Sequence, residues 1–164
     1  LYVSDSRGRV LVYRNPSAIG QNADRILGIL IDNLANPAAP ANETQLGIAE
    51  SLLLIDGTLA VVDTSNNRVV RYNAADTWPQ ETPAVFSPSM RDVVGQDNFN
   101  SREPNRGATG PTATGFNLPV DAAVLNNNLF VVDSDNHRVI VFPGGVPFNQ
   151  PANRLFGQTL FDAN

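Results

Sequence analysis

The sequence predicts an all-β fold built from a repeated unit of four short antiparallel strands. The first observation is a pair of alternating apolar strands around a tight polar turn, which occurs at 1–13, 59–72 and 129–142. The Leu residues that lead these copies are 58 and 70 positions apart. The second observation is that the segments flanking this hairpin also recur in the same order. A unit that returns at such a spacing indicates a repeat architecture.

An apolar strand, here called the lead strand, precedes the hairpin in two of the copies. The segments 48–55 and 118–125 align without a gap when one is shifted by 70 positions. Asp56-Gly57 follows the first and 126–128, all Asn, follows the second. These residues favour tight hairpin turns because they tolerate a positive φ. The copy at 1–13 begins within the hairpin, and its turn is one residue shorter.

A short strand that ends in glycine closes each unit. Residues 21–28 closely match 150–157, and 90–95 is a looser copy. An Ile or Phe then follows in each copy, at Ile31, Phe99 and Phe161. Residues 24–35 also fit a helical period, but their match to the other copies favours a strand.

Four consecutive antiparallel strands form one blade of a β-propeller. One blade cannot bury both of its faces, so neighbouring blades must stack on it. We expect a partial first blade at 1–31 and complete blades at 48–99 and 118–161, about 2.75 blades in a ring of roughly four to eight. Open blade edges are prone to association. We therefore expect either a fragment that lacks upstream residues or one chain of an assembly that completes the ring.

Two long loops join the glycine-ended strand of one unit to the lead strand of the next. They span 32–47 and 97–117 and are rich in Pro, Asn, Gly and Ala. A further surface excursion at 74–86 holds Trp78. Antiparallel strand order places both loops on the same face as the hairpin turns. Long loops on a rigid scaffold are common binding sites, but they can also be plain solvated connectors.

The hairpins at 61–69 and 131–139 resemble the NHL repeat, a family named for an Asn-His-Leu-type turn. Asn136-His137-Arg138 nearly matches the core of that motif, whereas Asn66-Asn67-Arg68 lacks the His and Arg7-Gly8-Arg9 is shortened. The resemblance covers nearly the whole chain and implies a β-propeller, commonly six-bladed, similar to large bacterial NHL-repeat proteins. The family includes protein-binding scaffolds, RNA-binding domains and a metal-dependent lyase, so the resemblance indicates the fold more than the function.

Composition restricts the classes of partner. The net charge is −5 and all eleven basic residues are Arg, which argues against binding driven by phosphate neutralisation, and we expect no nucleic-acid partner. No apolar run approaches the roughly 20 residues that span a bilayer. The absence of Cys excludes disulfides and thiolate metal sites. Together with the Asn- and Pro-rich loops, the resemblance implies an extracytoplasmic bacterial protein, whether secreted, periplasmic or on the cell surface.

An Asp and an Arg recur at the ends of each hairpin turn, and we assign them a structural role. Each Asp can accept hydrogen bonds from backbone N–H groups of its turn, and each Arg can pair with the same or a neighbouring Asp. Recurrence in every unit favours structure over catalysis, because functional sites usually break a repeat. The turn residues are Asp5, Arg9, Asp63, Arg68, Asp133 and Arg138.

The sequence holds only incomplete signals for a metal site or a catalytic site. Residues 133–136 resemble the start of a calcium loop, but they lack its Gly at position six and Glu at position twelve. His137 is the single His, so a His-rich zinc site of the kind implied by the lyase members cannot form. Glu50, Asp121 and Asp32 could surround a central channel, as in lactone-hydrolysing propellers. We predict no catalytic residue, metal ligand or cofactor.

The first interpretation is therefore a non-enzymatic module that binds a protein partner, or itself, through its loop face and open strand edges. The residues expected on its contact face are Arg102, Glu103, Asn105, Arg106, Asp135 and His137. The alternative is a propeller hydrolase or lyase, lactonase-like or metal-dependent, whose catalytic residues lie partly in blades outside this sequence.

Overall fold

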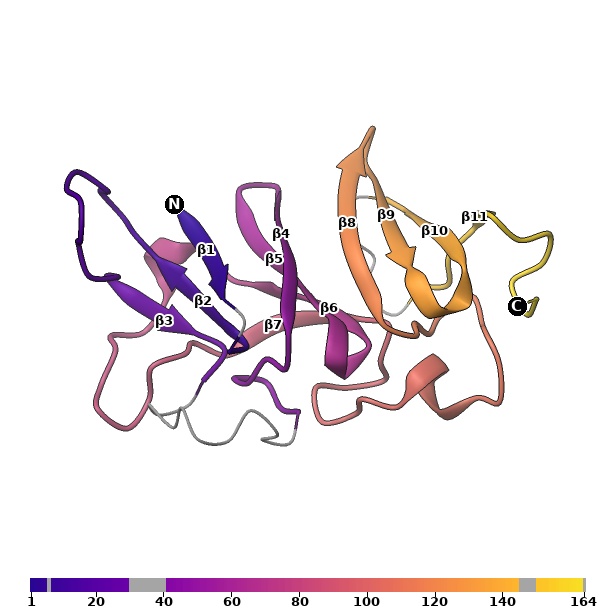
Figure 1. The fold of residues 1–164 in the computed structure, drawn as a ribbon, viewed down its shortest axis with the longest axis horizontal. Helices are drawn as coiled ribbons and strands as arrows, with labels where there is room; N and C mark the ends of the chain where they lie inside the picture. Colours follow the sequence, from indigo (N-terminus) through magenta and orange to yellow (C-terminus); the bar gives the residue numbers. More distant parts are fainter. Residues whose placement is uncertain (6, 30–40, 145–149, 164) are drawn as a thin grey trace.

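The computed structural model describes residues 1–5, 7–29, 41–144 and 150–163 and confirms the all-β prediction. Its strands form three antiparallel sheets that lie in a row, consistent with propeller blades (Figure 1). The first sheet contains β1 (Tyr2–Asp5), β2 (Arg9–Val12) and β3 (Arg25–Leu27). The second contains β4 (Ala49–Ile55), β5 (Thr58–Asp63), β6 (Arg68–Tyr72) and β7 (Met90–Val94). The third contains β8 (Pro119–Leu125), β9 (Asn128–Asp133), β10 (Arg138–Pro143) and β11 (Arg154–Phe156).

The order of the strands within each sheet, and the register in which they pair, follow the repeat in the sequence. Consecutive strands pair in the orders β1-β2-β3, β4-β5-β6-β7 and β8-β9-β10-β11. The lead strands β4 and β8 both carry a register shift near their start, at 49–51 and 119–121. The part of the chain described contains no α-helix, and 3-10 turns such as η1 (Thr64–Asn66) and η4 (Ser134–Asn136) follow β5 and β9. The glycine-ended strand β3 confirms the strand reading of 25–27; Ile31 lies outside the described residues.

The hairpins reverse direction at residues that tolerate a positive φ. Asp56 and Gly57 between β4 and β5 have φ of 49° and 76°, and Asn126 and Asn127 between β8 and β9 have φ of 49° and 60°. Two consecutive positive φ values match the right-handed twist of the flanking strands. These turns lie at the upper end of the sheets in Figure 1, opposite the turns that contain η1 and η4.

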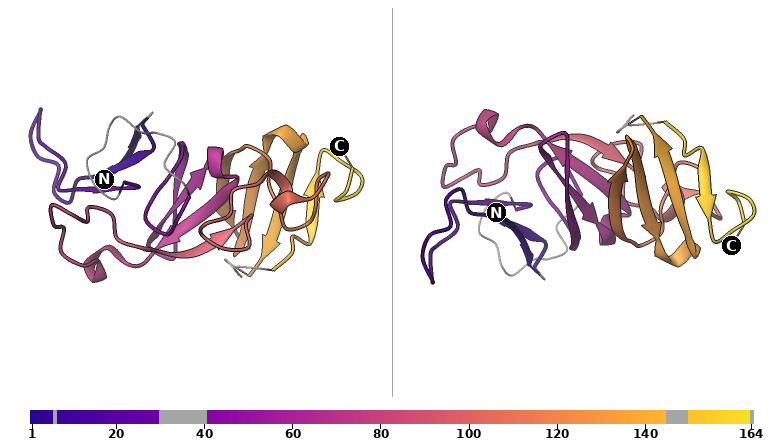
Figure 2. Two further views of the ribbon diagram at one scale, coloured as in Figure 1. Left: turned by 90° about the horizontal axis from the view of Figure 1, so that it is seen from below. Right: turned by 90° about the horizontal axis from the view of Figure 1, so that it is seen from above.

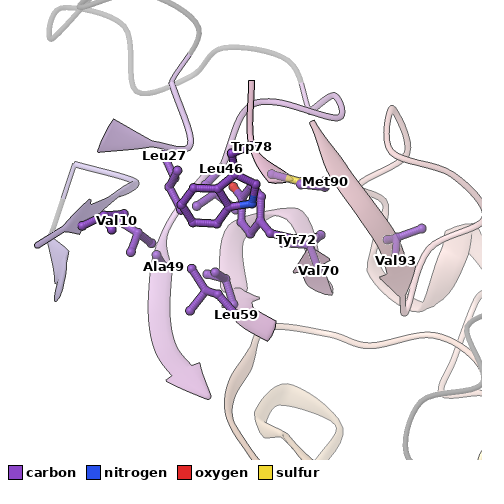
Figure 3. Packing of buried hydrophobic residues seen from close by; sticks show 12 residues of the cluster. Val10, Leu27, Leu46, Ala49, Leu59, Val70, Tyr72, Trp78, Met90 and Val93 are labelled. Atoms are coloured by element: carbon purple, nitrogen blue, oxygen red, sulfur yellow. The ribbon is translucent and has the colours of Figure 1, made fainter. Parts of the chain in front are cut away.

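The sheets stack face to face around two apolar clusters. In the first cluster, Val10, Val12 and Leu27 of the first sheet pack against the second sheet (Figure 3). The residues that meet them from the second sheet are Leu59, Val61, Val70, Tyr72 and Val93. The stacking thus buries two apolar faces that a lone sheet would leave in water. This burial stabilises the fold by roughly 25 cal/mol for each Å² of apolar surface removed from water.

The second cluster joins the second and third sheets with the same geometry. Its residues from the second sheet are Ile55, Ala60, Val62, Val69 and Val94, and those from the third include Leu129, Val131, Ile140 and Phe142. Figure 2 shows the sheets side by side from two opposite directions. Ser51 of β4 donates a hydrogen bond to Asp121 of β8, at 2.6 Å between oxygens, so the lead strands are neighbours.

The excursion at 74–86 lies at the surface, as predicted, but its Trp points inward. Trp78 is only 9% exposed and packs edge-on against Tyr72 in the first cluster, with ring centroids 6.1 Å apart. Its indole N–H donates to the carbonyl of Asn73. The excursion therefore helps to cover the joint between the first and second sheets. No helix in the described parts of the chain is long and apolar enough to cross a membrane.

Candidate binding face

The three hairpin turns each carry an Asp–Arg ion pair, formed within the same hairpin. Arg68 Nε lies 2.8 Å from Asp63 Oδ2, and Arg138 Nε lies 2.7 Å from Asp133 Oδ2. All four of these side chains are fully buried. The pair of Arg9 with Asp5 is partly exposed, at 20% and 24% of the two side chains.

The buried aspartates hold a loop as well as an arginine. Asp63 Oδ1 accepts from the backbone N–H of Gly47, and Asp133 Oδ1 accepts from that of Asn117, at 2.8 and 2.7 Å. We expected the backbone donors to belong to the turn itself, as Arg7 does at Asp5. In the two complete units they belong instead to the loop that precedes the lead strand. Each aspartate therefore ties a turn to the start of its own unit.

Each buried guanidinium binds two loops through their carbonyl oxygens. Arg68 donates to Phe99 at 2.6 Å and to Gln45 at 2.6 Å. Arg138 makes the matching contacts with Phe161 at 2.6 Å and Thr112 at 2.7 Å. An Arg is suited to this position because its five N–H donors can satisfy several acceptors at once. The long loops are thus held by the same residues that close the turns.

Burial and charge act in opposite directions on the turn carboxylates. Burial raises the pKa of Asp63 above its ordinary value, while the charge of Arg68 and hydrogen bonds from Asn66, Arg68 and Gly47 lower it. At Asp5 burial also raises the pKa, but hydrogen bonds from Arg9 and the backbone of Arg7, with the Arg9 charge, outweigh it. The pKa of Asp5 is consequently below its usual value.

In the second sheet, the residue that precedes the Arg of the turn contacts the next unit. Asn67 and His137 occupy equivalent left-handed positions, with φ of 52° and 51°. The Asn67 amide donates to the carbonyl of Arg102 at 2.8 Å and accepts from the N–H of Leu118 at 2.7 Å. Asn67 therefore links the second sheet to the loop and lead strand that follow. His137 is exposed at the corresponding end of the third sheet.

The loop 97–117 brings some of the predicted contact residues to the surface and turns one inward. Arg102 and Glu103 are exposed, and Arg106 pairs with Asp97. Asn105 is only 7% exposed, because its side-chain oxygen accepts from Asn136 at 2.8 Å. We therefore correct the expected surface position of Asn105, which fixes the loop to the η4 turn instead.

A hollow lies between the two long loops. It has a volume of about 460 Å³ and is lined by Asn42, Glu43, Thr44, Asn98, Phe99 and Asn100. Asn98 Oδ1 accepts from the backbone N–H groups of Asn100 and Ser101, so this wall of the hollow has a defined shape. The first part of the earlier loop, 32–40, lies outside the described residues.

The carboxylates considered for catalysis or calcium form no common site among the described residues. Asp133, the first residue of the calcium-like segment, uses Oδ1 for Asn117 and Oδ2 for Asn136 and Arg138. No group of three or more His, Asp or Glu side chains that could hold a metal ion occurs among the described residues. Asp121 and Glu50 are exposed on neighbouring lead strands, and Asp32 lies outside the described residues.

Sequence reasoning missed a second polar site, between the first sheet and the excursion. Arg25 is 3% exposed, lies 5.7 Å from the centre of the Trp78 ring and donates to the carbonyls of Phe86 and Pro79. Burial lowers the pKa of Arg25, and the charge of Glu81 opposes this. A cavity of about 540 Å³ beside Arg25 is lined by Arg14, Asp24, Arg25, Ala75, Asp76, Trp78, Pro79, Gln80 and Glu81. The only available signal was the single Trp, because the excursion has no counterpart in the other units.

Comparison with known families finds a match for one of the repeated units. The family model of the NHL repeat matches residues 116–142, which span the lead strand β8, the strand β9, the η4 turn and most of β10. A search of curated proteins gives no match to the chain. The matched segment contains the Asp133–Arg138 pair that recurs as Asp63–Arg68 in the second sheet. The match shows an NHL repeat at 116–142, and the three blade-like sheets are consistent with a propeller built from such repeats.

Proposed function

We propose that this chain is a non-enzymatic NHL-repeat module that binds a protein partner through the face formed by its turns and long loops. The observation that carries the proposal is the rigid attachment of this face. Arg68, Asn67 and Asn136 hold the loop 97–117 through bonds of 2.6 to 2.8 Å. A surface ordered before binding loses less conformational entropy when a partner docks.

The exposed groups on this face suit a protein surface. Arg102, Glu103, Asp135 and His137 present both signs of charge and protrude from fixed turns. Mixed charge of this kind favours specific orientation of a partner over non-specific attraction to a polyanion. The hollow between 42–44 and 98–100 adds a concave feature with one aromatic wall, Phe99.

The recurring carboxylates support a binding role rather than catalysis. Asp63 and Asp133 are buried and are bound by an Arg, an Asn side chain and a backbone N–H group. Carboxylates used in this way hold the face together and are not available to a substrate. The alternative role as a hydrolase or lyase would need residues other than these.

Site-specific photo-crosslinking in cells that express the chain tests the proposal. A photoreactive residue in place of Arg102 or His137 samples the loop face, and one in place of Asp56 or Asn126 samples the opposite turns. We expect the first pair, but not the second, to capture one protein. The affinity of that purified protein should fall at least about tenfold, roughly 1.4 kcal/mol, for the charge exchange R102E/E103R.

Asp56→Asn, at the opposite end, is the matched control and should bind as the unaltered chain does. Equal capture from both ends, or an affinity insensitive to the charge exchange, would contradict the proposed face. Elemental analysis provides a separate check. Stoichiometric calcium or zinc that survives dialysis would favour the metal-dependent hydrolase or lyase.

A further inference from the structure

Each sheet has two faces, and the chain itself shows which kinds of face pack together. We call the face toward the following sheet the front face and the one toward the preceding sheet the back face. The front face of the second sheet includes Ile55, Ala60, Val62, Val69 and Val94, each at most 4% exposed. The back face of the third sheet covers these residues. The first and second sheets meet in the same way.

The front face of the third sheet repeats these apolar positions, but here they are exposed or half-buried. Leu125, Phe130, Val132 and Val139 lie 70 positions after Ile55, Ala60, Val62 and Val69, and Phe156 matches Val94 by its place before the closing glycine. Leu125 is 61% and Phe156 is 54% exposed, and the other three are half-buried. The third sheet thus has an apolar front face that no described sheet covers.

The back face of the first sheet is exposed in the complementary way. Cross-strand pairing places Val3, Leu11 and Ile26 on one face, opposite the buried Val10 and Leu27. Val3 is 39% exposed, and Leu11 and Ile26 are half-buried. Their counterparts on the back face of the second sheet are Val61, Val70 and Val93, which are at most 7% exposed. Among the described sheets, a front face is therefore uncovered on one side and a back face on the other.

We propose that a second copy of this chain packs head to tail on the first, with the front face of the third sheet of one copy against the back face of the first sheet of the other. This inference goes beyond the proposed function of the loop face and names a partner for the two open sheet faces. The two exposed faces are the same two kinds of surface that meet twice inside each copy. A head-to-tail contact that closes makes a ring.

For the 164-residue chain by itself, the number of sheets sets the number of copies expected in a ring. Each copy contributes three sheets, and propellers close with roughly four to eight blades. Two copies give six sheets, the one multiple of three within that range. The proposed assembly is therefore a closed pair whose two contacts are related by a twofold axis.

Light scattering of the purified 164-residue chain over a dilution series tests the proposal. We expect a native mass of twice the chain mass of 17.6 kDa. Phe156→Asp places a charge on the exposed front face, and Val3→Asp places one on the exposed back face. Each should raise the dissociation constant at least tenfold, because a charge buried in an apolar contact without a partner is costly. Ile19→Asp, at a fully exposed position outside both faces, should keep the pair intact.

Two outcomes overturn the proposal. A monomer at all concentrations shows that these faces are not covered by a second copy, and leaves them to flanking chain or another protein. Loss of association in only one of the two variants shows a face that pairs with itself. Circular dichroism confirms that the variants fold. Because R102E/E103R lies on the loop face, it should leave the native mass unchanged, so failure of the pair and failure of loop-face binding are separate results.

Discussion

At the scale of the residue, the same Asp–Arg pair occurs in three turns but in two environments. In the second and third sheets both partners are buried, and the arginine also satisfies carbonyl oxygens of two loops. In the first sheet the Asp5–Arg9 pair is partly open to water. Water screens a charge pair and solvates whichever partner is left alone. One motif should therefore differ in its contribution to stability from sheet to sheet.

Truncating the arginines tests this difference. Arg68→Met or Arg138→Met leaves a buried carboxylate without its counter-charge, and we expect each to lower the free energy of unfolding by about 3–5 kcal/mol. Arg9→Met should lower it by only about 0–1 kcal/mol. Urea unfolding followed by circular dichroism measures all three under one set of conditions. Equal losses at positions 9 and 68 would show that burial does not determine the value of the pair.

Residue identity alone does not reveal which members of a motif are exposed. Asn105 was expected on the surface, yet Asn105 and Arg106 both adopt positive φ, and this conformation turns the Asn105 side chain toward Asn136. Arg25 and Arg154 occupy the same repeat position, but only Arg25 is buried, because the excursion with Trp78 covers it. Such contacts depend on loops that have no period, so no repeat pattern could predict them.

At the scale of the element, closing glycines allow neighbouring units to approach. Gly95 follows β7 with a φ of 93° and forms an isolated parallel bridge with Gly115 of the long loop. A Cβ on Gly95 would lie 2.2 Å from the ring of Phe116, which is fully buried in the second cluster. Both the conformation and the space exclude a larger residue here. The end of each outer strand therefore helps to set the spacing between sheets.

Gly95→Ala should lower the free energy of unfolding by about 2–4 kcal/mol, because it combines a left-handed backbone with a clash in the core. Gly57→Ala is the matched control, since Gly57 also has a positive φ, of 76°, but has no atom within 4 Å of an added Cβ. We expect the control to show the backbone cost alone, about 1–2 kcal/mol. Thermal unfolding followed by circular dichroism compares the two. If both variants lose the same stability, the Phe116 contact is unimportant.

Strands and turns were the elements that sequence predicted best, because their signals are local. The period-2 alternation at 59–72 and 129–142 and the turn residues at 56–57 and 126–127 correspond to observed hairpins. The Asp–Arg pairing was also visible from recurrence. The position of the excursion at 74–86 was not, because it depends on a contact between Trp78 and a distant strand.

At the scale of the whole molecule, the row of three sheets has one apolar face exposed at each end. If these faces pair between copies as we propose, the folded state is stabilised by mass action. The melting temperature of the unaltered chain should then rise with protein concentration. That of Phe156→Asp should stay constant over the same range, which differential scanning calorimetry can measure. A melting temperature independent of concentration for both proteins would contradict coupling between folding and association.

The Asn67 bridge also bears on how such a chain changes length during evolution. The Asn67 side chain binds a backbone carbonyl and a backbone N–H of the next unit. Every non-proline residue provides these groups, so the Asn67 bonds do not require a matching side chain on the other side. Duplication of a whole unit would carry the Asn with it and meet a suitable backbone at once. As far as the Asn67 bonds are concerned, lineages of this protein can therefore gain or lose entire units without a compensating substitution.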